Sequence, residues 1–181
     1  MTTVTPLDLM SDEQRKARNE LRDALFGEDD LGIVIRSHVI IEQELWRFVK
    51  QSVTRPNYLS GRYLPFERLL DFAMALGIDK ELEAPLKRLA SIRNSFAHDV
   101  GRVLTTQDVS DLYSSWGADD RKHINKTYKD LRKSDRRRPE KFGKMPVRDQ
   151  FILMLMMMHS ALIAVTLREA TPKHETVGQE E

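Results

Sequence analysis

A charged residue interrupts the apolar face of a helix that the sequence predicts near the middle of the chain. With about 100° of rotation per residue, several apolar residues fall within about 40° of one line along this helix: Leu82, Leu86, Leu89, Phe96 and Val100. Arg93 falls on the same line. A guanidinium inside an apolar stripe is costly unless it finds a partner. We therefore expect Arg93 either to brace the core through an ion pair or to serve a site for an anionic ligand.

Helix signals recur along the whole chain and favour a single all-α domain. Ser11 and Gln14 have the spacing of a capping box, and glycines punctuate the ends of several apolar runs. Strand-like alternation of useful length does not occur in the sequence. We predict a helical bundle of about six helices over residues 11–170, between a flexible N-terminus (1–10) and a disordered tail (171–181). The predicted helices span residues 11–26, 31–53, 65–77, 85–98, 106–116 and 147–170.

The composition is that of a soluble globular protein. The chain has 181 residues, of which 40% are hydrophobic and 31% charged, which is enough for one domain with its own core. It has no cysteine, which excludes disulfides and thiolate chemistry and fits a reducing compartment. The longest apolar run, residues 151–167, contains polar residues and is shorter than the ~20 residues that span a bilayer. The N-terminus lacks the features of a signal peptide, so we expect a cytoplasmic protein with no membrane partner.

The helix predicted over residues 31–53 is apolar on nearly every side and should therefore be central. Its polar stripe is narrow and consists of Arg36, Gln43, Arg47 and Lys50. Four further polar residues lie off this stripe and are candidates for burial: Ser37, His38, Glu42 and Glu44. A buried acid on this helix could neutralise the guanidinium of Arg93. We accordingly expect a polar brace composed of Glu42, Glu44 and Arg93.

The helix predicted over residues 85–98, which we call the motif helix, also carries a possible catalytic set. Asn94 and His98 are four residues apart and lie on one helical face beside the apolar stripe. His98 could cap the helix end, or it could remove the proton of an RNA 2′-hydroxyl while Arg93 stabilises the phosphate, which needs no metal. About 140° of helix rotation separates Arg93 from His98. A catalytic set of Arg93, Asn94 and His98 thus requires a bent side chain, a helix that ends between them, or two protomers.

A basic insert occupies residues 118–146. Residues 121–148 contain 12 Lys or Arg and 3 Asp or Glu, a balance of +9, whereas the rest of the chain contains 17 and 25, a balance of −8. We expect a helix up to about residue 133, followed by a loop. The insert is either a solvated charged loop or a contact for nucleic acid or another polyanion. The candidate contact residues are Arg132, Lys133, Arg136, Arg137 and Arg138.

The sequence gives no sign of a metal or cofactor site. Its five histidines show no ligand spacing with carboxylates, and H-E-x-x-H does not occur. A glycine-rich phosphate loop and a G-x-S-x-G elbow are also missing. We therefore predict no metal and no cofactor.

Three strings resemble the mannitol operon repressor (MtlR-like) family. They are LPFERLLDFAMALG at 64–77, LASIRNSFAH at 89–98 and LTTQDVSDL at 104–112. The resemblance covers roughly residues 30–116 and 147–168, and leaves the basic insert unexplained. It implies an all-α fold that tends to dimerise and regulates transcription through protein partners, without a recognisable DNA-binding motif. The methionine-rich helix over residues 147–170 suits both a core and a homodimer seam.

A shorter string, RNSFAH, is similar to the R-x4–6-H signature of HEPN domains. Catalytic members of that group are metal-independent endoribonucleases with their site at a dimer cleft, and many other members are inactive binding modules. The resemblance assigns Arg93, Asn94 and His98 to the site. Two hypotheses follow: a dimeric regulatory protein of the mannitol-repressor type, and a HEPN-type ribonuclease or toxin acting on RNA. Nucleic-acid binding without cleavage is a third.

Overall fold

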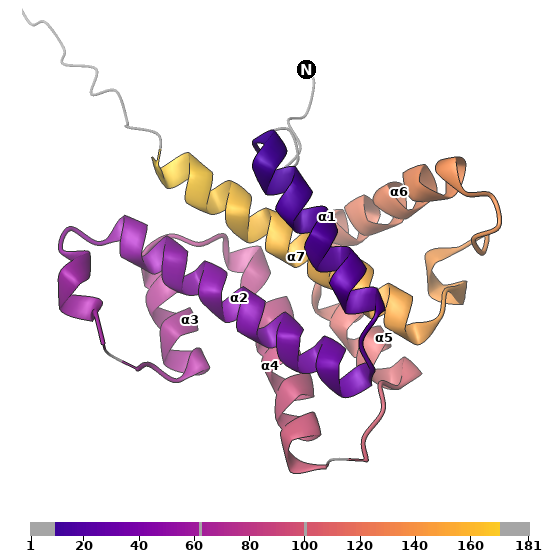
Figure 1. Cartoon of the computed structure of the whole chain (residues 1–181), viewed down its shortest axis with the longest axis horizontal. Helices are drawn as coiled ribbons and strands as arrows, with labels where there is room; N and C mark the ends of the chain where they lie inside the picture. Colours follow the sequence, from indigo (N-terminus) through magenta and orange to yellow (C-terminus); the bar gives the residue numbers. More distant parts are fainter. Residues whose placement is uncertain (1–9, 62, 100, 171–181) are drawn as a thin grey trace, which may run out of the picture.

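The computed structural model describes residues 10–61, 63–99 and 101–170, and this part of the chain is all-α, as expected (Figure 1). Seven α-helices form one bundle, and no strand occurs among the described residues. Three short 3-10 helices, η2 to η4, span Pro56–Leu59, Lys80–Leu82 and Phe142–Lys144. The α-helices are α1 (Asp12–Phe26), α2 (Asp30–Ser52), α3 (Phe66–Ala75), α4 (Glu83–His98), α5 (Thr106–Ser115), α6 (Ala118–Ser134) and α7 (Val147–Ala170).

The centre of the bundle is the packing of α2 against α7, the most extensive contact between any two helices. α3 and α4 pack on α2, while α1 and α5 pack on α7. α7 has the length and composition of a membrane span, yet 72% of its apolar stretch is buried inside the fold. This confirms the prediction of a buried helix for the longest apolar run. Helices that are apolar on most sides become central because burying apolar surface is the main stabilising term in folding.

Several predicted helix ends are confirmed by their hydrogen bonds. Gln14 donates its backbone N–H to Ser11 Oγ (3.2 Å), and Ser11 donates its own to Gln14 Oε1 (2.9 Å), which completes the capping box. Gly77 follows α3 with a φ of 103°, a conformation that favours glycine. The motif helix starts two residues earlier than Pro85, at Glu83, because the 3-10 turn before it leads directly into α4.

The two predicted terminal segments are mostly outside the described residues, since the description begins at residue 10 and ends at residue 170. Met10 is the last residue of the N-terminal segment that we predict to be flexible, but the structure places it in the fold. Its side chain is buried, and Arg15 Nε donates to its carbonyl oxygen (3.1 Å). Helix α1 is therefore anchored to the fold by the residue that precedes its cap.

The basic insert, 118–146, is folded as a helix and a returning loop, which we call the basic hairpin. Tyr128 is buried on α6, and its hydroxyl donates to the carbonyl oxygen of Pro139 (2.6 Å). Phe142 is buried too, with its ring centroid 5.5 Å from that of Tyr113 and 6.1 Å from that of Tyr128. These aromatic contacts fix the returning loop to α6 and α5, and Figure 1 shows the hairpin at one end of the bundle.

Candidate functional site

Arg93 lies at the edge of the buried face of α4 and is partly exposed. The face turned to the core is formed by Leu86, Leu89, Ile92 and Phe96. Ile92 takes the inward position and Arg93 the flank, because the buried residues centre slightly to one side of the line that the sequence suggested. Val100, which we also placed on that line, is outside the described residues.

The predicted brace of Arg93 with Glu42 or Glu44 is wrong. Among the residues that the structure describes, no carboxylate lies within 4.0 Å of the Arg93 guanidinium, which donates instead to Asn94 Oδ1 (3.2 Å). Glu44 is buried, accepts two hydrogen bonds from Arg47 Nη1 (2.7 and 2.6 Å), and lies 3.5 Å from His159 Nε2 on α7. The acids of α2 thus contact other residues, and no carboxylate of the described chain neutralises the Arg93 cation.

A buried histidine on α2 faces the charge of Arg93. His38, one of the predicted buried polar residues, packs on Phe66 with ring centroids 4.4 Å apart, and its Nδ1 is 3.9 Å from Glu42 Oε2. Burial and the Arg93 cation lower the pKa of His38 from 6.5 to about 4. His38 is therefore neutral at neutral pH and leaves the positive charge at this point to Arg93.

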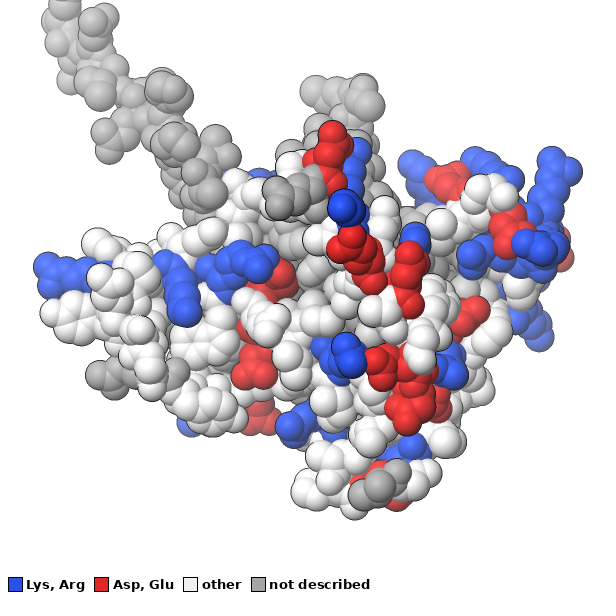
Figure 2. Space-filling view, viewed as in Figure 1, with Lys and Arg blue, Asp and Glu red and all other residues white. Residues whose placement is uncertain are grey.

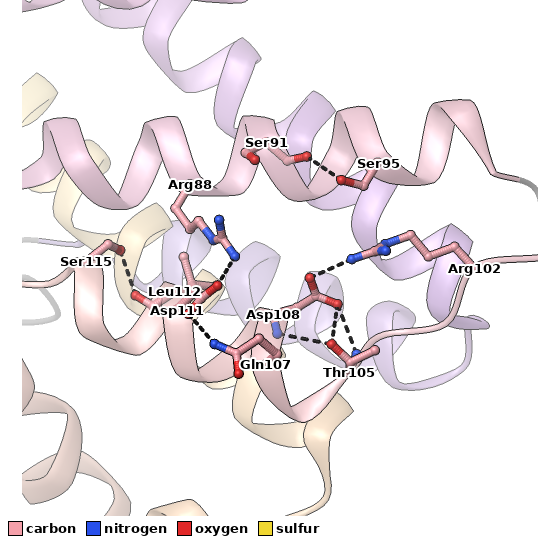
Figure 3. Close-up of polar contacts among 10 residues, drawn as sticks. All are labelled: Arg88, Ser91, Ser95, Arg102, Thr105, Gln107, Asp108, Asp111, Leu112 and Ser115. Carbon is pink, nitrogen blue, oxygen red and sulfur yellow. Dashed lines mark hydrogen bonds and ion pairs between the residues drawn. The ribbon is translucent and has the colours of Figure 1, made fainter.

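The braces that hold α4 come from residues that the sequence analysis did not select (Figure 3). Arg88 on α4 pairs with Asp111 on α5. Arg102, just after α4, donates to the buried carboxylate of Asp108 (2.7 Å), and its guanidinium carbon lies 5.5 Å from the centre of the Phe96 ring. The capping-box spacing of Thr105 and Asp108 is the sequence signal that indicates this contact. It places the Asp108 carboxylate beside the segment that precedes α5, where Arg102 lies.

Asn94 and His98 are exposed, and His98 is the last residue of α4. Because α4 continues without a break through His98, the rotation of about 140° between Arg93 and His98 remains. No hydrogen bond joins His98 to Arg93 or Asn94 in the described part of the chain. A single chain therefore joins Arg93 to Asn94 by a hydrogen bond, while His98 lies about 140° around the helix from Arg93.

Two open hollows on the surface of the described residues are not lined by Arg93, Asn94 or His98. One, of about 530 Å³, lies beside Trp46, Arg47 and Lys50 on α2. The other, of about 370 Å³, lies within the basic hairpin, between α6 and the returning loop. The described residues contain no group of three His, Cys, Asp or Glu side chains placed to hold a metal ion.

Comparison with protein-family models, with curated proteins and with solved structures gave no match. What supports a function is therefore the exposed end of α4. It carries a partly exposed cation that no carboxylate of the described residues neutralises, a neighbouring amide, and an imidazole at the helix terminus. Arginine and amide side chains are suited to phosphate oxygens, and an imidazole is suited to proton transfer.

Proposed function

We propose that this protein is a dimeric, cytoplasmic, metal-independent endoribonuclease of the HEPN type. One observation carries the proposal: the Arg93 guanidinium is partly exposed and is not occupied by any carboxylate of the described chain. Because Arg93 lies at the flank of α4 and makes no ion pair with the described residues, its remaining donors are available to an anion. The R-x4-H resemblance supplies the reaction, and the exposed His98 supplies the base.

The reaction uses three side chains in distinct roles. His98 removes the proton of a ribose 2′-hydroxyl, and the resulting oxygen attacks the adjacent phosphorus. The bond from phosphorus to the 5′ oxygen breaks, this oxygen takes a proton from water, and a 2′,3′-cyclic phosphate remains. Arg93 stabilises the charge that builds up on the phosphate oxygens, while Asn94 holds the guanidinium in position.

The helix geometry makes the site one that two copies share. With about 140° between them, Arg93 and His98 of one chain cannot both face the same phosphate without distortion. In a symmetric dimer whose α4 ends face each other, Arg93 of one copy and His98 of the other approach one phosphate, and the symmetry generates two such sites.

The test is RNA cleavage in EDTA, read by the formation of 2′,3′-cyclic phosphate ends. We expect cleavage by the wild type, loss of at least about a hundredfold with His98→Ala or Arg93→Ala, and no change with Ser91→Ala, an exposed control on the same helix. Circular dichroism and size-exclusion chromatography verify that each variant folds and dimerises. A folded wild-type dimer that cleaves no RNA would overturn the proposal.

Mixing the two inactive variants tests the shared site. A dimer of one Arg93→Ala chain and one His98→Ala chain keeps one intact site if the two residues act across the dimer. Refolded together, the variants should then regain roughly a quarter of the wild-type activity, because half of the dimers are mixed and each has one of two sites. If both residues act within one chain, mixing restores nothing.

A second candidate is a dimeric regulatory protein of the mannitol-repressor type, which acts through protein partners. The observation that favours it is a stripe of partly exposed apolar residues at roughly four-residue spacing along α7: Leu153, Met157, Ala161 and Val165. Such a stripe suits another helix, from a second copy or from a protein partner. A Met157→Glu chain that remains folded but loses dimerisation or partner binding supports this candidate, and RNA cleavage by the wild type separates it from the first.

A further inference from the structure

The cations of the basic hairpin divide into two classes that the sequence does not distinguish. The engaged class is held by neighbouring acids or carbonyl oxygens. Lys122 and Lys133 each pair with an Asp at 2.7 Å, and Arg137 and Arg138 share Asp135. Of the candidate polyanion contacts predicted from the sequence, only Arg136 has no such partner among the described residues; the engaged ones are Arg132, Lys133, Arg137 and Arg138.

Part of the free class lines the hollow of the hairpin. Lys129 on α6 and Lys141 and Lys144 on the returning loop are exposed and line this hollow of about 370 Å³. No carboxylate of the described chain lies within 4.0 Å of their ammonium groups, and Glu140 is the one acid in the lining. Lys126 lies one turn before Lys129 on the same helix and is exposed as well.

We propose that this hollow binds the phosphate backbone of a nucleic acid strand through Lys129, Lys141 and Lys144, and holds the RNA that the proposed ribonuclease cleaves. The proposal rests on the proposed function for the choice of RNA, and on the hairpin itself for the phosphate chemistry. An ammonium group is a compact cation suited to phosphate oxygens, and its flexible stem adapts to successive phosphates.

The residues that line the hollow favour contacts to phosphates over stacking on bases. Its two aromatic residues, Tyr128 and Phe142, are 1% and 5% exposed, so their rings are not available for stacking on bases. Contacts to phosphates without base stacking give binding that depends on salt and little on sequence.

Two further properties of the molecule favour this end for a polyanion. The hairpin is held by the hydrogen bond from Tyr128 to Pro139 and by the buried Phe142 ring, so binding does not require it to fold. The charge of +9 over residues 121–148 contrasts with −8 over the rest of the chain, so the field steers a polyanion to this end. Figure 2 shows Lys and Arg side chains gathered over the hairpin, at the right of the view.

The test measures binding in the His98→Ala background, in which RNA stays intact, by fluorescence anisotropy of a labelled 20-nucleotide RNA across a salt series. The test variant carries Lys129→Gln, Lys141→Gln and Lys144→Gln. The control carries Lys16→Gln, Lys122→Gln and Lys133→Gln, which removes the same charge from lysines that are already paired. We expect the test variant to bind at least about tenfold more weakly and to lower the salt slope by about 2, and the control to change affinity less than about threefold.

Binding of DNA and of anionic lipid vesicles shows which source of phosphate the hollow prefers. Cleavage assays separate the phosphate-binding proposal from the ribonuclease proposal. A DNA strand of the same sequence should also bind and lose affinity with the test variant, because the contacts are to phosphates. Equal losses in test and control variants, or preferred binding to vesicles of anionic lipid, would overturn the inference. Binding without any cleavage overturns the ribonuclease proposal and leaves the phosphate site standing.

Discussion

Arg102 donates a 2.7 Å hydrogen bond to the buried carboxylate of Asp108, and this contact ties the segment after α4 to the first turn of α5. Asp108 also accepts from the backbone N–H and the hydroxyl of Thr105 (3.0 and 2.8 Å). The end of α4 that carries His98 is therefore held in place by a neighbouring brace rather than by the motif itself. Arg93 has no acidic partner among the described residues and so remains available to a ligand.

Asp108→Ala should destabilise the fold by about 2–4 kcal/mol. It removes the carboxylate that accepts from the backbone N–H and the hydroxyl of the N-cap residue Thr105, and it leaves the Arg102 guanidinium without its charged partner. At this chain length, that corresponds to a fall in Tm of roughly 5–15 °C, which differential scanning calorimetry measures. Ser110→Ala, an exposed neighbour on α5, is the control and should leave Tm within about 2 °C.

Arg93→Ala should change the free energy of unfolding by less than about 1 kcal/mol, because Arg93 is partly exposed and makes no ion pair with the described residues. Removing one partner of a buried pair would cost roughly 3–5 kcal/mol instead. Urea unfolding distinguishes the two values. A loss of the larger size would show that Arg93 is structural, and it would remove the main support of the ribonuclease proposal.

Stability should fall as the pH drops from 6.5 to about 4, in part because of His38. The unfolded chain binds a proton at His38 with a pKa near 6.5, whereas burial and the Arg93 cation lower the native pKa to about 4. The unfolded state thus takes up more protons within this window, which lowers the free energy of unfolding by at most about 3 kcal/mol. Urea unfolding as a function of pH should show a shallower slope for His38→Gln; an identical slope would contradict the assigned pKa.

Glu44→Ala should cost about 1–3 kcal/mol, because it removes the acceptor of Arg47 and the neighbour of His159 Nε2 at the packed α2–α7 contact. The Nδ1 of His159 is buried and already has no partner among the described residues, so the variant leaves both ring nitrogens unpaired. Glu42→Ala on the same helix is the matched control, since Glu42 is only half-buried, and it should cost less. Thermal unfolding of the two variants side by side checks the order.

Phe142→Ala should loosen the basic hairpin and cost about 3 kcal/mol, because it empties the space beside Tyr113 and Tyr128. Amide hydrogen exchange should accelerate over residues 118–146 more than over α2. Lys141→Ala, the exposed neighbour of Phe142, should leave exchange unchanged. Uniform acceleration across the whole chain would mean that the hairpin is not a separate unit of stability.

Local sequence signals accounted for most of the helices. Capping residues such as Ser11 and Thr105, and the glycine after α3, act within a few residues of their own position, so they can be recognised without knowing the fold. The apolar character of α2 and α7 also predicted that both would be buried, because a helix that is oily on most sides has to be covered.

The partners of the polar residues depended on tertiary structure. The sequence places Arg93 in the apolar stripe and Glu44 on another central helix, and this arrangement favours an ion pair between them. A side-chain contact depends on the rotation of two helices about their own axes. In the structure Arg93 lies at the flank of α4, and Glu44 contacts Arg47 and His159.

The order of residues along the chain determined by itself where helices begin and end, which of them are central, and where positive charge accumulates, because periodicity, capping and charge are properties of short segments. Only the three-dimensional packing decided which cations are neutralised. Arg88 and Arg102 are paired, whereas Arg93 has no acidic partner among the described residues. Of the hairpin lysines, Lys122 and Lys133 pair with Asp, and Lys129, Lys141 and Lys144 line an open hollow. Ion pairs join residues within a few ångströms in space, and that proximity is set by how the helices dock.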